Sequence, residues 1–70
     1  MEIIPVSSSN IAAVGYDESS QTLQVEFNNG TRYQYFDVPE QVFMELKDAG
    51  SPGGYFASSI KGVYRYSRVW

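Results

Sequence analysis

The stretch TLQVEFNNGTRYQYFDVP, residues 22–39, contains two alternating segments, a turn between them and the start of a helix. In residues 22–27 apolar side chains alternate with polar ones, which is typical of a half-buried strand. Residues 28–30 favour a turn, because Asn and Gly readily adopt the positive φ angles that hairpin loops require. The stretch therefore predicts a β-hairpin with strands at about residues 22–27 and 31–36.

The length of the turn determines the face of the sheet on which Tyr33 and Tyr35 lie. A two-residue loop would set Val25 opposite the polar Gln34. A three-residue loop, with its glycine in the left-handed conformation, sets Val25 opposite Tyr33 and Leu23 opposite Tyr35. Because a shift of one residue moves every side chain to the other face, the register that buries a consistent set is favoured. We predict the three-residue loop, which places both tyrosines on the core side and lets only their hydroxyls reach outward.

Two helices are predicted after the hairpin. The first spans about 39–49, since Pro39 suits a first helical turn, apolar side chains recur at helical spacing, and a glycine follows. The second spans about 52–61, with Ser51 as its N-cap. The first helix is expected to cover the apolar face of the hairpin.

The predicted fold class is α+β, a three-stranded antiparallel meander packed by the two helices. The expected strands are 11–16, 22–27 and 31–36, the C-terminal segment 63–70 extends as an edge strand, residues 1–6 form an irregular N-terminal arm, and 7–70 form a single domain. The chain has 43% hydrophobic residues and no cysteine or histidine. Side-chain packing must therefore stabilise the domain without a disulfide or a Cys/His zinc site.

The composition also excludes several classes of protein. No run approaches the roughly 20 apolar residues of a membrane span, and the first residues lack a basic start followed by an apolar stretch. We expect a cytoplasmic protein that holds no metal and no cofactor. Without histidine or cysteine, the serines have no neighbouring base to activate them, so no catalytic activity is expected.

Charge is distributed unevenly along the chain, whose formal net charge is −3. All eight acids lie in residues 1–48, whereas residues 49–70 contain three bases, three large aromatic residues after position 60, and no acid. Bases that neutralise phosphate and rings that stack on unpaired bases are the components of a nucleic-acid surface. The candidate residues are Lys61, Arg65, Arg68, Arg32, Tyr64, Tyr66 and Trp70. The alternative is that they are solvated side chains of an edge strand, which also discourage aggregation.

The first turn of the second predicted helix contains two glycines. Each lowers the stability of the helix by roughly 1 kcal/mol relative to alanine, so we expect a structural or functional reason for their presence. One hypothesis is an anion site, in which the N–H groups of Gly53 and Gly54 beside Ser51 receive a phosphate. The alternative, which we favour, is that glycine allows the helix to approach the sheet or the first helix closely. Neither of the common phosphate-loop spacings is present.

Five segments in a fixed order resemble the KTSC domain family. They are Ser-Ser-Asn-Ile-Ala-x-Val-Gly-Tyr-Asp at residues 8–17, Leu-x-Val-x-Phe-x-Asn-Gly at 23–30, Tyr-x-Tyr-x-Asp-Val-Pro at 33–39, Gly-x-Tyr-Phe at 53–56 and Ile-Lys-Gly-x-Tyr-x-Tyr at 60–66. The family takes its name from the C-terminal extension of some lysyl-tRNA synthetases and also occurs as small bacterial and phage proteins. The resemblance implies RNA or tRNA as a partner and draws attention to the Tyr-x-Tyr motif.

Two functional hypotheses follow. In the first, the chain is a small non-catalytic binding module that contacts RNA through its basic, aromatic C-terminal surface. In the second, it is a protein-interaction or structural module that involves no nucleic acid, and its edge strand pairs with a partner's strand. The net negative charge favours the second hypothesis, because it repels RNA at long range.

Overall fold

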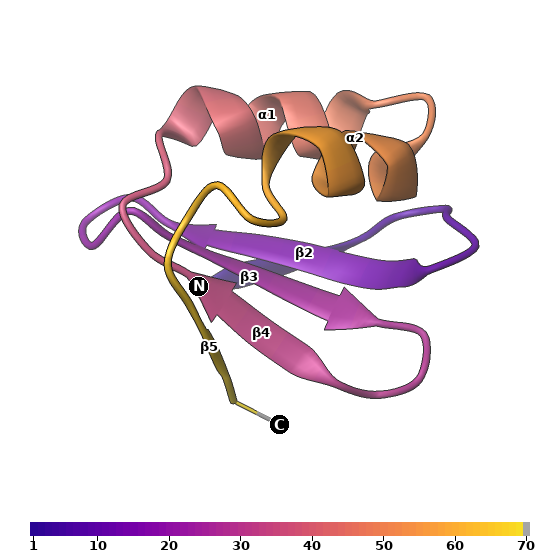
Figure 1. Ribbon diagram of the computed structural model, residues 1–70, viewed down its shortest axis with the longest axis horizontal. Coiled ribbons are helices and arrows are strands. Elements are labelled where there is room, and N and C mark those ends of the chain that lie inside the picture. The colour runs from indigo at the N-terminus through magenta and orange to yellow at the C-terminus, as the bar shows by residue number, and fades with distance from the viewer. Residues whose placement is uncertain (70) are drawn as a thin grey trace.

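The computed structural model describes residues 1–69. In this part of the chain, five strands form one antiparallel sheet in the order β1-β2-β3-β4-β5, and two helices lie on one of its faces (Figure 1). The elements are β1 (Glu2–Pro5), β2 (Ile11–Asp17), β3 (Thr22–Phe27), β4 (Arg32–Tyr35), α1 (Glu40–Asp48), α2 (Pro52–Ser59) and β5 (Tyr66–Arg68). The predicted α+β class is confirmed, and the predicted three-stranded meander forms the centre of a wider sheet.

The hairpin of β3 and β4 has the predicted three-residue loop. Leu23 pairs with Tyr35 and Val25 pairs with Tyr33. The N–H of Phe27 donates to the carbonyl of Thr31 at 2.9 Å, which closes the loop. The loop glycine, Gly30, has φ of 91°, the left-handed conformation that a side chain would oppose.

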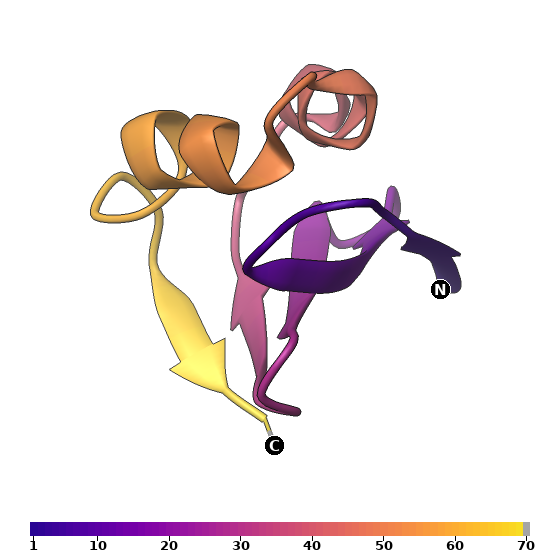
Figure 2. The same ribbon diagram turned by 90° about the vertical axis from the view of Figure 1, so that its right-hand side faces the viewer.

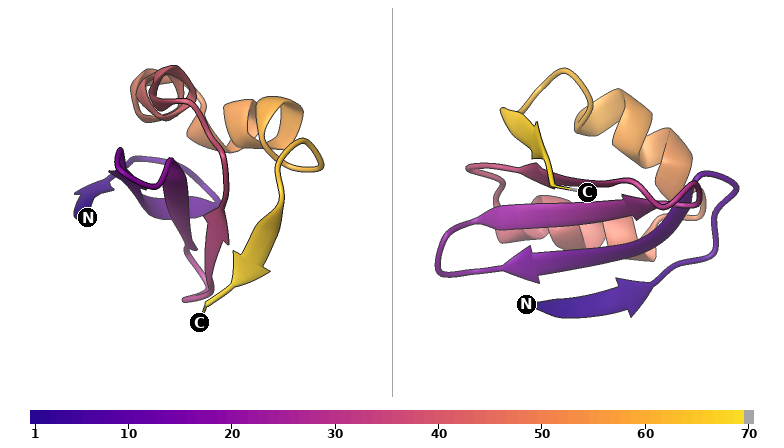
Figure 3. Two further views of the ribbon diagram at one scale, coloured as in Figure 1. Left: turned by 90° about the vertical axis from the view of Figure 1, so that its left-hand side faces the viewer. Right: turned by 90° about the horizontal axis from the view of Figure 1, so that it is seen from below.

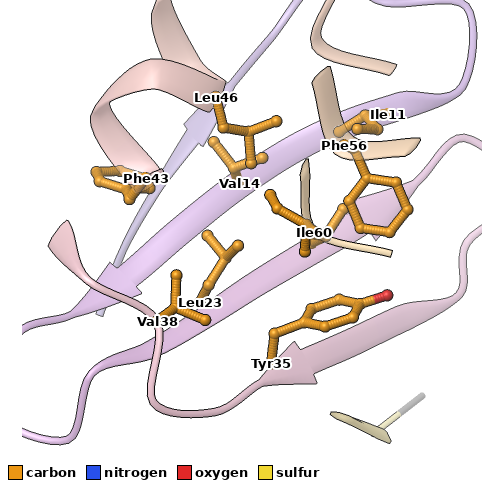
Figure 4. Close-up of a cluster of buried hydrophobic side chains, with 10 residues drawn as sticks. Ile11, Val14, Leu23, Tyr35, Val38, Phe43, Leu46, Phe56 and Ile60 are labelled. Carbon is orange, nitrogen blue, oxygen red and sulfur yellow. The ribbon is translucent and has the colours of Figure 1, made fainter. Parts of the chain in front are cut away.

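The core lies between the sheet and the helices, as predicted. Its buried members are Ile11, Val14, Leu23, Val25, Tyr35, Val38, Phe43, Leu46, Phe56 and Ile60. Figure 4 shows side chains from the strands pointing toward those of the two helices. Seen end-on in Figure 2, both helices lie above the same face of the sheet, with α2 on the side of β4 and β5.

The helices are slightly shorter than predicted. Pro39 is the N-cap of α1, so the helix starts one residue later than expected. Ser51 caps α2 as predicted, since its Oγ accepts a hydrogen bond from the N–H of Gly54. Both helices therefore begin close to the positions at which the sequence predicts them.

The prediction of an irregular arm at residues 1–6 is wrong for residues 2–5, which form β1. This strand pairs antiparallel with β2, from Glu2 opposite Tyr16 to Pro5 opposite Ala13. Proline is compatible with this position, because an edge strand can direct its missing N–H away from the ladder. The sheet consequently extends one strand further than predicted on this side.

The C-terminal segment forms the opposite edge of the sheet, although only Tyr66–Arg68 are a strand. Backbone hydrogen bonds extend the contact with β4, since Phe36 N–H donates to the Arg65 carbonyl and Val69 N–H to the Arg32 carbonyl. The predicted edge strand is thus confirmed over a shorter length. Trp70 lies outside the described residues. Figure 3 shows the face of the sheet that carries neither helix.

Candidate functional site

An aromatic pocket of about 390 Å³ lies between α2, the turn that follows it, and the edge of the sheet formed by β3, β4 and β5. It is called the aromatic pocket because most of the residues that line it carry aromatic rings. The residues that line it are Phe27, Tyr33, Tyr35, Phe56, Lys61, Gly62 and Tyr66.

The rings in the aromatic pocket form one continuous cluster. Tyr66 lies 5.8 Å from both Tyr33 and Tyr35, measured between ring centroids. Phe56 contacts Tyr35 edge-on at 5.5 Å and Phe27 at 5.4 Å. The cluster extends from the core to the surface, since Tyr35 is 5% exposed and Tyr66 is 61% exposed. Tyr66 is therefore the ring in this cluster most accessible to an incoming molecule.

Tyr35 supplies a hydroxyl group to the aromatic pocket. The Tyr35 hydroxyl makes no hydrogen bond to any residue in 1–69. Because no buried side-chain oxygen in that range lacks a hydrogen-bond partner, this unpaired hydroxyl must reach solvent. In Figure 4 the hydroxyl lies at the end of the ring remote from Leu23 and Val38. Burial, assisted by the neighbouring Tyr33 and Tyr66, raises the pKa of Tyr35 to about 12. The hydroxyl is thus a neutral hydrogen-bonding group at physiological pH.

A second pocket, of about 460 Å³, adjoins the first along α2. Phe27, Phe56 and Lys61 line both. We call the second one the polar pocket, because its other walls carry hydroxyl, amide and backbone groups. These come from Ser9, Asn10, Asn28, Asn29 and Gly53.

Among the described residues that line the two pockets, Lys61 carries a positive charge and none is acidic. It lies two residues after the end of α2, a helix that itself carries no charged residue. Its side chain is exposed. The two pockets together form one groove. Although the protein has a net negative charge, the groove has a positive local charge, because Lys61 lines it and no acidic residue among 1–69 does.

The predicted basic surface is divided by the structure. Arg65 pairs with Asp37 at 2.9 Å and lies over the ring of Phe36. Arg32 approaches Glu26 at 3.7 Å, and alternation along β4 places it on the face opposite to that of Tyr33. Neither arginine lines either pocket. Acidic neighbours therefore offset both charges, and neither arginine adds to the charge of Lys61 in the pockets.

The remaining predicted residues lie closer to the pockets. Arg68 is opposite Tyr33 in the ladder, which places it on the helix-covered face beside the aromatic pocket. Tyr66 lines that pocket. Tyr64 is half-buried and packs against the core, so its ring is less accessible than that of Tyr66. Trp70 is outside the described residues.

At the start of α2, one of the two N–H groups of the hypothesised anion site already has a hydrogen-bond partner within the protein. The N–H of Gly54 donates to Ser51 Oγ at 3.3 Å. A Cβ on Gly53 would lie 3.3 Å from Ser8 Oγ and 3.4 Å from Asn10 Nδ2. The close approach is therefore to the connection between β1 and β2, rather than to the sheet or the first helix as predicted.

Two further features, a cluster of metal-binding side chains and a membrane-spanning helix, are absent from residues 1–69. No group of three or more His, Cys, Asp or Glu residues in that range could hold a metal ion. Neither helix in the same range has the length and apolar character needed to cross a membrane.

Sequence reasoning missed part of the groove. Sequence patterns place Tyr33 and Tyr35 on the core side of the sheet, and no pattern indicates Phe27, Phe56 or Asn10 as pocket residues. The available signal was the repeated placement of aromatic residues on one face of three strands. The groove itself depends on how α2 lies across β3 and β4.

Comparison with known proteins identifies close relatives. The model of the KTSC domain matches residues 7–66. A crystal structure of a KTSC domain protein from Yersinia pestis superposes with a TM-score of 0.92 at 36% identity, covering 99% of this chain and 97% of that one. An uncharacterised protein of Stutzerimonas stutzeri is 39% identical over 70 residues, which is 99% of both chains. A lysine–tRNA ligase of Nostoc sp. is 40% identical over 67 residues, which cover 96% of this chain but 12% of the ligase.

Proposed function

The chain belongs to the KTSC domain family, and we propose that it is a small non-catalytic module that binds single-stranded RNA in the aromatic pocket. The observation that carries the proposal is the exposed ring of Tyr66 beside Tyr33, in a pocket that Lys61 lines and that no acidic residue among 1–69 lines. Exposed rings next to a cation are the usual means by which proteins hold unpaired bases without requiring a particular sequence.

The size and chemistry of the aromatic pocket suit a nucleobase. Its volume of about 390 Å³ lies at the small end of ligand sites, which span roughly 300–1,000 Å³. A base can stack on Tyr66, and the neutral hydroxyl of Tyr35 can exchange a hydrogen bond with an edge of that base. The ammonium of Lys61 can neutralise the adjoining phosphate.

The names of the relatives support RNA as the ligand class. Relatives that contain this domain as a small part of their length are named lysine–tRNA ligase, so in them the domain accompanies a protein that acts with tRNA. We extend this context to the present chain as part of the proposal, together with a cytoplasmic location. The absence of histidine and cysteine supports a binding role rather than a catalytic one.

The proposal is tested by titrating a fluorescently labelled single-stranded oligouridylate with the protein and measuring anisotropy at low and high salt. We expect saturable binding whose affinity falls with salt by a slope of about −0.7 per phosphate contact. Tyr66→Ala should weaken binding about tenfold or more, which is within the range for loss of one stacking ring. Tyr66→Phe keeps the ring and should bind like the original protein.

Two results would contradict the proposal. One is the absence of binding at low salt, and the other is binding that Tyr66→Ala leaves unchanged. If RNA fails to bind and the protein instead forms a dimer that Tyr66→Ala dissociates, the β5 edge is a protein-interaction surface. That result would support the second hypothesis from the sequence.

A further inference from the structure

We infer that the groove holds two successive unpaired nucleotides, with one base in the aromatic pocket and the edge of the other base facing Asn10 in the polar pocket. This inference rests on the proposed function and adds a footprint and a source of base preference to it. The two pockets differ in chemistry, since one is walled by rings and the other carries several amide groups. The first can accept any base by stacking, whereas the second can distinguish bases by hydrogen bonding.

The two pockets are adjacent and of similar size. Phe27, Phe56 and Lys61 form part of both walls, and the volumes are about 390 and 460 Å³. A ligand that occupied only one of them would leave the neighbouring space to solvent. A strand of RNA places a second base beside the first, so the shape fits two linked units better than one.

Asn10 is the residue best suited to contact the second base. Its backbone is fixed, because its N–H donates to Ser8 Oγ at 3.2 Å and its carbonyl accepts from Asn28 N–H at 2.8 Å. Its side-chain amide makes no hydrogen bond to any described residue, yet it lines the polar pocket. An amide offers a donor and an acceptor together, which matches the paired groups on a base edge.

Gly53 keeps room for this amide. A Cβ at position 53 would lie 3.4 Å from Asn10 Nδ2 and 3.3 Å from Ser8 Oγ, so a side chain there would crowd the polar pocket. Asn28 is less available than Asn10, because its Nδ2 donates to the carbonyl of Ser8 at 3.2 Å. Asn29 is also engaged, since its Oδ1 accepts from Thr31 at 2.7 Å.

Lys61 joins the two halves of the groove. Because Lys61 lines both pockets, its ammonium can neutralise a phosphate that links two bound bases. A mononucleotide can fill one pocket, but it cannot also occupy the other. Binding should therefore strengthen markedly between one nucleotide and two.

The test compares uridine 5′-monophosphate, the dinucleotide UpU, and single-stranded oligonucleotides of A, C, G and U, using the full chain and NMR or anisotropy titrations. We expect UpU to bind about tenfold more tightly than the mononucleotide, and the tightest and weakest of the four oligonucleotides to differ by about tenfold. Asn10→Ala should reduce that difference to about threefold or less. Gln41→Ala, which removes an exposed amide on α1, should leave it unchanged.

The outcomes separate this inference from the proposed function. If all four oligonucleotides bind and Asn10→Ala leaves their relative affinities unchanged, or if UpU binds no better than the mononucleotide, the two-nucleotide groove is wrong while RNA binding stands. If none of them binds, the proposed function itself fails. Should Asn10→Ala not fold, Asn10→Asp serves as the second variant, because it keeps nearly the same shape but replaces the amide donors with a negative charge. It should weaken binding to every oligonucleotide and change their order of affinity, and an unchanged order would contradict the contact with Asn10.

Discussion

At the scale of single residues, two tyrosines on the same face of the sheet have different environments. Tyr35 is buried in the core, and Tyr66, opposite it on the neighbouring strand, is mostly exposed. The first position follows from alternation along β4, and the sequence predicts it. The second could not be deduced in the same way, because whether a ring on an edge strand is covered depends on what packs above it. We therefore expect Tyr35 to contribute mainly stability and Tyr66 mainly binding.

Removal of the Tyr35 ring should destabilise the domain strongly. Tyr35→Ala is expected to lower the free energy of unfolding by roughly 3 kcal/mol or more, since it leaves a cavity among Phe56, Leu23 and Val38. Tyr66→Ala should cost less, because much of its ring is already in water. Urea unfolding followed by circular dichroism measures both. Equal losses for the two variants would contradict the difference in their roles.

The raised pKa of Tyr35 predicts a loss of stability in alkali. Tyrosine in the unfolded chain ionises near pH 10, whereas burial holds the pKa of Tyr35 at about 12 in the folded protein. The contribution of this group is therefore fully present below about pH 10 and is lost as the pH rises from 10 to 12. Unfolding by urea across this range should show a smaller decline for Tyr35→Phe. A decline identical to that of the original protein would assign the effect to other groups.

At the scale of elements, local patterns predicted the centre of the sheet and its C-terminal edge strand, but not the edge strand β1. The β3–β4 register follows from alternation and from turn chemistry, both of which are local. β1 was missed because it is a four-residue edge strand that ends in proline, and its order comes from pairing with β2. The division of the basic surface could in principle be predicted from the sequence. Arg65 and Arg68 are three residues apart, and an odd spacing along an extended segment places side chains on opposite faces.

The hairpin loop provides a test at this scale. Gly30→Ala should destabilise the protein by about 1–2 kcal/mol, the usual cost of a left-handed conformation for a residue with a Cβ. No atom lies within 4 Å of the added methyl group, so the cost arises from backbone conformation alone. Gly50→Ala is the matched control, since position 50 has equally open space without the positive φ. A similar free energy of unfolding for the two variants would contradict the assigned loop.

At the scale of the whole molecule, the groove illustrates what the sequence could not provide. Its walls come from the β1–β2 connection, the four strands β2 to β5, the β3–β4 loop, α2 and the turn after α2. No local pattern brings these segments together. The concentration of acids in residues 1–48 was visible in the sequence, but the absence of acids from the groove depends on the fold. Net charge is therefore a poor guide to binding here, and the position of each charge is more informative.

A matched pair of lysine variants separates the effect of net charge on binding from the effect of where a charge lies. Lys61→Gln and Lys47→Gln change the net charge equally, but Lys61 lines both pockets whereas Lys47 lies on α1 and pairs with Asp48. We expect Lys61→Gln to weaken oligouridylate binding several-fold and to reduce the magnitude of the salt slope by about 0.7, the loss of one phosphate contact. Lys47→Gln should change neither quantity. Equal effects of the two variants would show that only the overall charge matters.

The central claim is that single-stranded RNA occupies the groove between α2 and the β3–β5 edge of the sheet. Its most direct test is a two-dimensional NMR titration of the isotope-labelled protein with oligouridylate at low salt. We expect chemical-shift changes concentrated on Asn10, Lys61, Gly62 and Tyr66, with α1 unaffected. The absence of changes, or changes confined to α1 and to the face of the sheet that carries no helix, would contradict the account.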